Sequence, residues 1–396
     1  MTRRFRRQVL YIPGYDPFPP RRYRELFRRE GAAQAGISGY TLRMIPRACT
    51  DTGFGWAAET RIGGADAMVD VEVLVWDDIV RASMGHGILS TYGQLLRTAT
   101  TYVCSGTLFR LVRLRRGPVI AALYPIVVLM LQLLAAMLIG WLAGWIVSRV
   151  IGWWLGIPAW AAVTWGALVL WRRTDNRFFA YYLMQDYAFT AAEGGAYPPA
   201  LARRIQVFRD RIARALDGEW DEVLVIGHSS GAYLAVSALA DLFRHRPEGQ
   251  GTARLALMTL GHVVPMASLL PRADQLRTDL ADLSRSDVLT WVDVTAPGDA
   301  CCFALCDPVA VSGVAPVHQR WPLVISAAFS QTLSAERLSA LKNRWFRLHF
   351  QYLCAFDDPR NYDYFAITAG PQPLAERFAD RHHSPGRITL APRAVP

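Results

Sequence analysis

The residues best suited to chemistry lie in a Gly-x-Ser-x-Gly segment, in which Ser229 stands between Gly227 and Gly231. The continuous apolar run 223–226 before this segment predicts a buried strand, and 232–243 after it predicts a helix. A serine at a sharp turn from strand to helix is held in a strained conformation, and the turn needs small residues on either side. Its hydroxyl then lies beside the free N–H groups of the helix start. The pattern predicts a nucleophilic serine, and a Ser/Gly turn without chemistry is the alternative.

This strand–turn–helix segment resembles the nucleophile elbow of the α/β-hydrolase superfamily, in particular its lipase and esterase members. The resemblance implies a mostly parallel sheet flanked by helices, the chain order nucleophile, acid, histidine, and an oxyanion hole of two backbone N–H groups. One of these belongs to the residue after the nucleophile, Ser230. The other follows an early strand, where Pro13-Gly14-Tyr15 is similar to the His-Gly-aromatic turn of such enzymes. Because proline has no N–H, we expect Tyr15 to be the second donor, with Gly14 as the alternative.

A serine hydroxyl needs a base to take its proton, and this base is usually a histidine oriented by a carboxylate. The carboxylate is expected just past a strand that follows the elbow. The segment 288–295 predicts such a strand, and Asp299 lies in the turn after it. Asp299 is therefore the predicted acid. Asp293, inside the predicted strand, and Asp307, farther along, are the alternatives.

The base should come after the acid, which leaves four histidines as candidates: His318, His349, His382 and His383. His349 lies in the aromatic segment 345–352, whose side chains could fix an imidazole ring. We predict that His349 is the base, and the alternative is a core histidine bonded to a backbone carbonyl. His228, inside the elbow, is expected to be structural.

The rest of the chain alternates strand-like and helix-like segments. Strands are predicted over 8–12, 40–45, 69–76, 223–226, 254–260 and 288–295, and helices over 21–30, 197–216 and 232–243. Strands separated by helices predict a parallel sheet covered on both faces. The neighbouring carboxylates Asp77 and Asp78 are expected at the solvated end of a strand rather than in a paired-carboxylate site.

One segment, 118–171, is almost free of charge, with Arg149 as the one charged residue. It is long enough for two membrane crossings, because one crossing takes about 20 apolar residues. We expect a transmembrane hairpin that turns near Ser148-Arg149 and divides one hydrolase domain into 1–117 and 172–396. Arginines at both ends place both soluble parts in the cytoplasm by the positive-inside rule, at the inner membrane. A buried soluble hairpin and a re-entrant hairpin are the alternatives.

The composition supports a membrane partner more than a nucleic acid. Hydrophobic residues make up 52% of the 396 residues, charged residues 19%, and the formal net charge is +10. A basic protein can meet nucleic acid or an anionic membrane, but the sequence has no pattern of a nucleic-acid-binding module. The six cysteines, including Cys301, Cys302 and Cys306, lack the spacing of a zinc site and are interpreted as free thiols. The proposed reaction needs no metal or organic cofactor.

These features predict a membrane-anchored serine esterase or lipase that cleaves a carboxylic ester through Ser229, His349 and Asp299. The hairpin makes a lipidic substrate plausible because it would hold the site near acyl lipids. Two other functions stay open. One is acyl transfer to an acceptor other than water, and the other is a non-catalytic membrane protein that keeps the fold as an interaction module.

Overall fold

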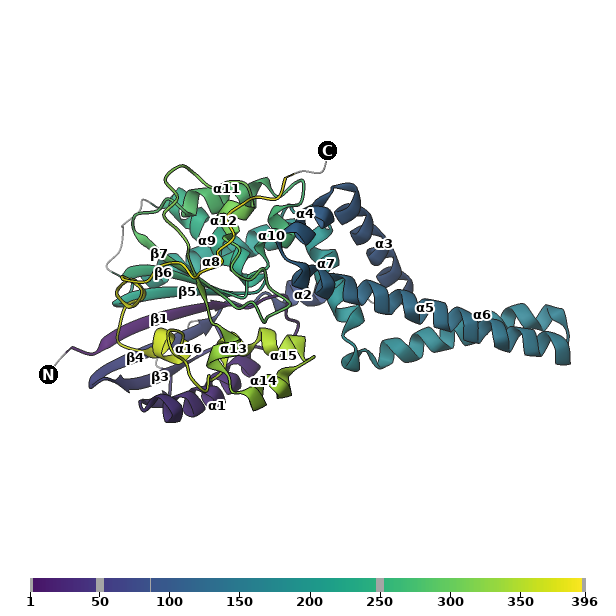
Figure 1. Ribbon diagram of the computed structural model, residues 1–396, viewed down its shortest axis with the longest axis horizontal. Helices are drawn as coiled ribbons and strands as arrows, with labels where there is room; N and C mark the ends of the chain where they lie inside the picture. The colour runs from purple at the N-terminus through teal and green to yellow at the C-terminus, as the bar shows by residue number, and fades with distance from the viewer. Residues whose placement is uncertain (1–2, 48–52, 86, 247–252, 394–396) are drawn as a thin grey trace.

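The computed structural model describes residues 3–47, 53–85, 87–246 and 253–393. They form an α/β fold around one eight-stranded, mostly parallel sheet with the order β2-β3-β4-β1-β5-β6-β7-β8 (Figure 1). The strands are β1 (Phe5–Ile12), β2 (Thr41–Ile45), β3 (Gly55–Ile62), β4 (Ala65–Val73), β5 (Glu222–His228), β6 (Arg254–Leu260), β7 (Leu289–Thr295) and β8 (Leu323–Ser326). Strands β4, β1 and β5 to β8 run parallel, and the meander β2-β3-β4 is antiparallel.

Strand β1 joins the two halves of the chain into this sheet. It pairs with β4 on one side and with β5 on the other, so that Arg7 lies opposite Glu222 although the two are far apart in the sequence. The buried guanidinium of Arg7 and the carboxylate of Glu222 form an ion pair of 2.5 Å. The segments before and after the apolar hairpin therefore build one sheet.

All six predicted strands are confirmed, with changes at their ends. The strand predicted over 69–76 ends at Val73, and Asp77 and Asp78 begin helix α2 instead of closing a strand. Acidic side chains favour the start of a helix because of its partial positive charge. Strands β3 and β8 were not predicted. The first carries several polar residues, and the second has only four residues.

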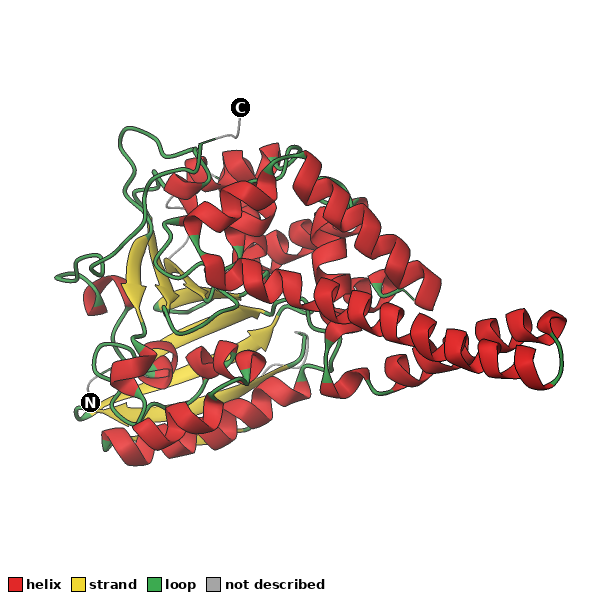
Figure 2. Ribbon diagram, turned by 45° about the vertical axis from the view of Figure 1, so that its right-hand side comes forward, coloured by secondary structure: helices red, strands yellow, loops and turns green. Residues whose placement is uncertain are grey.

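Helices cover both faces of the sheet (Figure 2), and the three predicted helices are among them. The larger ones outside the hairpin are α1 (Arg21–Ser38), α3 (Ile88–Cys104), α7 (Ala180–Ala191), α8 (Pro199–Leu216), α9 (Gly231–His245) and α11 (Asp274–Leu283). The shorter ones are α2 (Asp77–Ser83), α4 (Thr107–Leu114), α10 (Val264–Ser268), α12 (Pro308–Val311), α13 (Phe329–Thr332), α14 (Ala335–Leu341), α15 (Trp345–His349), α16 (Tyr364–Ala369) and α17 (Leu374–Arg377). Two 3₁₀ turns, η1 (Asp175–Arg177) and η2 (Gln351–Leu353), complete the described elements.

The core follows from the alternation of side chains along the strands. In β1, Val9 and Tyr11 enter the core on the side of α1 and α16, whereas Leu10 and Ile12 enter the core on the side of α8, α9 and α11. Successive side chains of a strand point to opposite faces, so a strand buried on both faces must be apolar throughout. This explains the continuous apolar run in β5, all of whose residues are buried.

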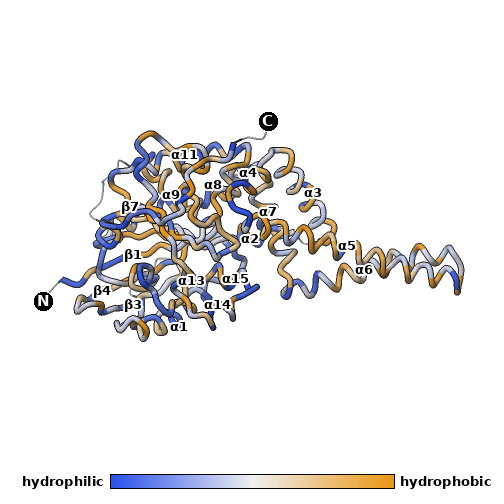
Figure 3. Tube along the Cα trace, viewed as in Figure 1, coloured by the Kyte–Doolittle hydropathy of each residue, from blue (hydrophilic) through white to orange (hydrophobic). Residues whose placement is uncertain are grey.

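The two apolar helices α5 (Arg116–Val150) and α6 (Trp153–Arg173) project from this body as a hairpin (Figures 1 and 3). Both are long and apolar enough to cross a membrane, and most of their surface is exposed. They pack closely, since a Cβ on Gly140 would lie 2.1 Å from Thr164 Oγ1. The expected turn near Ser148-Arg149 is displaced, because α5 continues to Val150 and the chain reverses at Gly152.

Candidate active site

Ser229 occupies the turn between β5 and α9 with a backbone φ of 56°, in the left-handed region that non-glycine residues rarely adopt. Its N–H donates to the carbonyl of Leu260 at 2.9 Å, which ties the turn to β6. The two glycines allow this geometry. A Cβ on Gly227 would lie 2.5 Å from the carbonyl oxygen of Gly231, and a Cβ on Gly231 would lie 2.1 Å from that of Ile12. The Ser229 side chain itself is half-buried.

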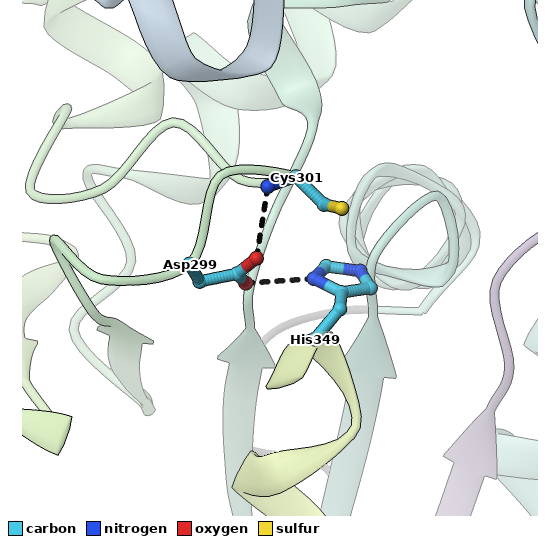
Figure 4. A group of neighbouring side chains, drawn as sticks. All are labelled: Asp299, Cys301 and His349. Atoms are coloured by element: carbon cyan, nitrogen blue, oxygen red, sulfur yellow. Dashed lines mark hydrogen bonds and ion pairs between the residues drawn. The ribbon is translucent and has the colours of Figure 1, made fainter. Parts of the chain in front are cut away.

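Asp299 and His349 lie side by side although they are distant in the sequence (Figure 4). Asp299 follows β7 in a turn, and His349 is the last residue of α15. His349 Nδ1 and Asp299 Oδ2 are 2.7 Å apart, and both residues are buried. The Asp299 carboxylate also accepts the N–H of Cys301 at 2.9 Å and the hydroxyl of Tyr352 at 3.0 Å. Burial acts to raise the pKa of Asp299, but His349 and these donors outweigh it and hold that pKa below its usual value.

The second ring nitrogen of His349 is available. Nε2 is buried and makes no hydrogen bond within the described part of the chain. A Cβ on Gly261 would lie 3.1 Å from His349 Cε1, the carbon bonded to this nitrogen. Gly261 directly follows Leu260, which accepts the N–H of Ser229, so the ring lies next to the elbow. The hydroxyl of Ser229 and the imidazole of His349 are not hydrogen-bonded to each other in the described residues, as is common in enzymes without bound substrate.

His228 lies against His349, the predicted base, and is hydrogen-bonded to its backbone. Its Nε2 lies 3.0 Å from the carbonyl oxygen of His349, and the two rings are 4.8 Å apart between centroids. Burial lowers the pKa of His228 to about 3, so this ring is neutral at physiological pH. A neutral ring can donate Nε2–H to the His349 carbonyl and so fix the end of α15.

The other candidate acids and bases are used elsewhere. Asp293 accepts a hydrogen bond from Thr259 inside the sheet, and Asp307 caps α12 and pairs with Arg387. The remaining candidate histidines, His318, His382 and His383, are exposed. The structure therefore brings together only Asp299 and His349 among the candidates that the sequence offered in the described residues.

The loop that carries Tyr15 and its alternative Gly14 approaches Ser229, which Ser230 directly follows. Gly14 approaches so closely that a Cβ there would lie 3.0 Å from Ser229 Cβ and 3.5 Å from its Oγ. The loop is fixed on both sides, since Trp76 donates to the carbonyl of Pro13 at 2.9 Å and Tyr182 donates to that of Tyr15. The N–H groups of Tyr15 and Ser230 form no hydrogen bond with the parts of the chain that are described. Both can therefore bind an oxyanion.

Two residues near the site were missed by the sequence analysis, and the first is Cys301. Its Sγ lies within 4.8 Å of the nearest ligand atoms of Asp299 and His349, a grouping that could hold a metal ion. However, Asp299 and His349 already hydrogen-bond each other, and burial raises the pKa of the Cys301 thiol. Neutral thiols are poor metal ligands, so the geometry fits an acid–base pair better. The described cysteines are free, and Cys49 lies outside the described residues.

Asp186 on α7 is the second missed residue. Burial raises its pKa to about 7, and the nearby His349 partly opposes this shift. No hydrogen bond to its carboxylate is formed within the described residues. Sequence reasoning had no signal for it, because α7 follows the hairpin and carries no motif.

Comparisons with protein-family models, with curated proteins and with solved structures returned no match to this chain. The functional argument therefore rests on the site itself.

Proposed function

We propose that this chain is a serine hydrolase of the α/β-hydrolase type that cleaves a carboxylic ester. The observation that carries the proposal is the 2.7 Å contact between Asp299 and His349, beside a serine at positive φ between a strand and a helix. A carboxylate that holds one imidazole nitrogen leaves the other free to act as a base. The N–H groups of Tyr15 and Ser230, which have no partner among the described residues, would supply the remaining requirement, stabilisation of an oxyanion.

The proposed reaction uses these groups in sequence. His349 Nε2 takes the proton of Ser229 while Oγ bonds to the ester carbonyl carbon, and the N–H groups of Tyr15 and Ser230 bind the resulting oxyanion. The carbon–oxygen bond to the alcohol then breaks, and His349 returns the proton to the departing alkoxide. Water then gives a proton to His349 and bonds to the acyl carbon, the bond between that carbon and Ser229 Oγ breaks, and His349 returns the proton to Oγ as the acid leaves. Asp299 stays ionised and orients the imidazole throughout.

A fluorophosphonate probe tests this proposal, because it bonds covalently to activated serines. The purified full chain should be labelled, and Ser229→Ala should lose both the label and ester hydrolysis. Ser90→Ala is the matched control, since Ser90 is exposed on α3. Labelling of Ser229→Ala to the level of the wild type would overturn the assignment.

We also propose that the hairpin α5–α6 spans the membrane, with both soluble parts on the cytoplasmic side. Arginines at each end support this orientation, with Arg113 and Arg115 before the apolar stretch and Arg172 and Arg173 after it. Protease added to inside-out vesicles should then digest the sheet domain and spare the hairpin. Protection of the sheet domain in these vesicles would contradict the orientation.

A further inference from the structure

A groove of about 730 Å³ lies between the start of α1, helices α14 and α15, and the segment that follows α6. Its walls reach the proposed active site at two points. Phe350 and Gln351 directly follow His349, and Tyr182 donates a hydrogen bond to the carbonyl of Tyr15. We call this space the arginine groove. Residues that line the groove therefore adjoin the proposed base in the chain and bond to the oxyanion loop.

The charge of the groove is strongly one-sided. Two carboxylates, Glu30 and Asp175, line it against five arginines, namely Arg22, Arg29, Arg337, Arg344 and Arg347. Asp175 accepts the N–H groups of Tyr181 and Tyr182, and Glu30 lies beside Arg29 and Arg337. Both carboxylates thus already have partners, and the lining of the groove carries a net positive charge.

Arg344 and Arg347 are the two arginines of the groove without a local partner. Neither forms a hydrogen bond or an ion pair through its side chain with a described residue, and both are exposed. Arg344 directly precedes α15 and Arg347 lies within it, a spacing that puts side chains on the same side of a helix. Two planar guanidinium groups on one face match the oxygens of a phosphate.

The remaining wall of the groove is apolar and aromatic. Phe179 and Phe346 lie 5.5 Å apart between ring centroids, and the guanidinium of Arg22 lies 4.8 Å from the ring of Phe350. Leu26 and Leu341 also line the groove. A ligand that suits these walls has an anionic group at one end and a hydrocarbon part next to it.

Two of the segments that line the groove, α15 and the segment after α6, lie near the base of the hairpin (Figure 1). Phe179 closely follows the end of α6, and Trp345, between the two unpaired arginines, lies 5.9 Å from Tyr124 of α5 between ring centroids. If α5 and α6 cross the bilayer, the mouth of the groove lies at the membrane surface. Lipids reach it there without leaving the membrane.

We propose that the arginine groove binds the phosphate-bearing head of an anionic membrane lipid, with Arg344 and Arg347 on the phosphate and the aromatic wall along the adjoining chain. This inference rests on the proposed function, because it names the substrate class of that site. The bound lipid presents its acyl ester to Ser229.

A binding experiment on the Ser229→Ala full chain in neutral detergent tests the inference without depending on catalysis. The probes are dihexanoyl phosphatidic acid and dihexanoyl phosphatidylcholine as monomers, with isothermal titration as the readout. We expect the anionic lipid to bind about 10- to 100-fold more tightly, and the added substitutions Arg344→Gln and Arg347→Gln to abolish that preference. The matched control adds Arg203→Gln and Arg214→Gln, which remove two exposed arginines of α8 outside the groove and should keep the preference.

Three results would overturn the inference. They are equal binding of the two lipids, a preference that persists in the Arg344→Gln, Arg347→Gln protein, and inorganic phosphate binding as tightly as the lipid. The last result would show a simple phosphate site. Thermal unfolding shows whether each variant is folded. Fluorophosphonate labelling of the wild type is measured separately. If the wild type is labelled but the Ser229→Ala chain binds both lipids equally, the lipid site is rejected and the proposed hydrolase function is not.

Discussion

Two buried aspartate–histidine pairs lie in the described part of the molecule, and they differ in the surroundings of the carboxylate and of the ring. Asp299 and His349 are 2.7 Å apart, and the second nitrogen of His349 lies next to the elbow without a partner in the described residues. Asp293 and His262 are 3.6 Å apart and fully enclosed. The nitrogen of His262 nearest Asp293, Nε2, also lies 3.0 Å from the carbonyl of Cys306. Each ring thus has one nitrogen without a partner in the described residues, and the ring of His349 is the one that packs against Gly261 beside the serine turn.

The two carboxylates also differ in the direction in which their pKa is shifted. Burial raises the pKa of Asp293 to about 6. Burial acts on Asp299 in the same direction, but the neighbouring His349 and the hydrogen bonds that Asp299 accepts outweigh it and hold its pKa below the usual value. A carboxylate with a lowered pKa stays ionised beside an imidazolium over a wider pH range than one whose pKa is raised. Burial is common to both pairs. The hydrogen-bond donors around Asp299 and the position of the His349 ring beside the serine turn are what favour the first pair as the proposed catalytic pair.

The largest expected effect separates the two histidines. His349→Gln should lower kcat for a small soluble ester by about 10⁵-fold, because it removes the base. His262→Gln should leave kcat per folded molecule within about threefold, because the ring of His262 contacts Cys306 and Asp293 and not the proposed triad. Circular dichroism in detergent gives the folded fraction of each variant. Comparable losses of kcat in both variants would contradict the division between the pairs.

The next effect separates the two carboxylates. Asp299→Asn should lower kcat by about 10⁴-fold, because a neutral amide favours the wrong imidazole tautomer and cannot stabilise the imidazolium. The protein should remain folded, since the amide oxygen can still accept the N–H of Cys301, and the amide N–H can donate to the hydroxyl oxygen of Tyr352 in place of the bond that Asp299 accepts from it. Steady-state kinetics with the same ester measures this loss. An Asp299→Asn enzyme with nearly normal kcat would remove Asp299 from the mechanism.

For Asp293 the expected effect is on stability rather than on rate. Its raised pKa favours the protonated form in the folded state, so its contribution to stability is present below about pH 4 and is lost as pH rises through about 6. Between pH 5 and pH 7 the wild type should therefore lose about 1 kcal/mol of unfolding free energy relative to Asp293→Asn. Unfolding of both proteins in the same detergent at several pH values gives the difference. A constant difference across this range would contradict the raised pKa.

The features predicted from the sequence are those set by neighbouring residues. The apolar run of β5, the glycines around Ser229 and the length of the hairpin are all local, so periodicity and composition reveal them. Strand β3 contains the consecutive polar residues 59–61 and β8 is very short, which explains why neither was predicted.

Long-range contacts explain what the sequence did not reveal about the site. The arginine groove is lined by Arg22 of α1 and by Arg344 and Arg347 near α15, and no pattern in the sequence indicates that these residues lie close together. Asp186 reaches the site because α7 packs back on the body after the hairpin. The choice between Asp293 and Asp299 was open for the same reason, since only the fold shows which one meets His349. The catalytic roles of Ser229, Asp299 and His349 stay predictions.

The smallest effect sharpens the comparison by testing a third carboxylate, Asp186, which lies near His349. Burial raises the pKa of Asp186 to about 7, so it becomes negative as pH passes through neutrality. Its charge then favours the imidazolium that His349 forms when it takes the serine proton. Asp186→Asn should therefore lower kcat/KM by about threefold at pH 8 and hardly at all at pH 6. A threefold change in kcat/KM corresponds to about 0.7 kcal/mol of transition-state stabilisation. The control Asp186→Glu should keep the rise in rate, since it retains the charge. An equal loss at both pH values would mean that Asp186 acts through packing, and a gain at pH 8 would mean that its charge opposes the oxyanion more than it assists the imidazolium.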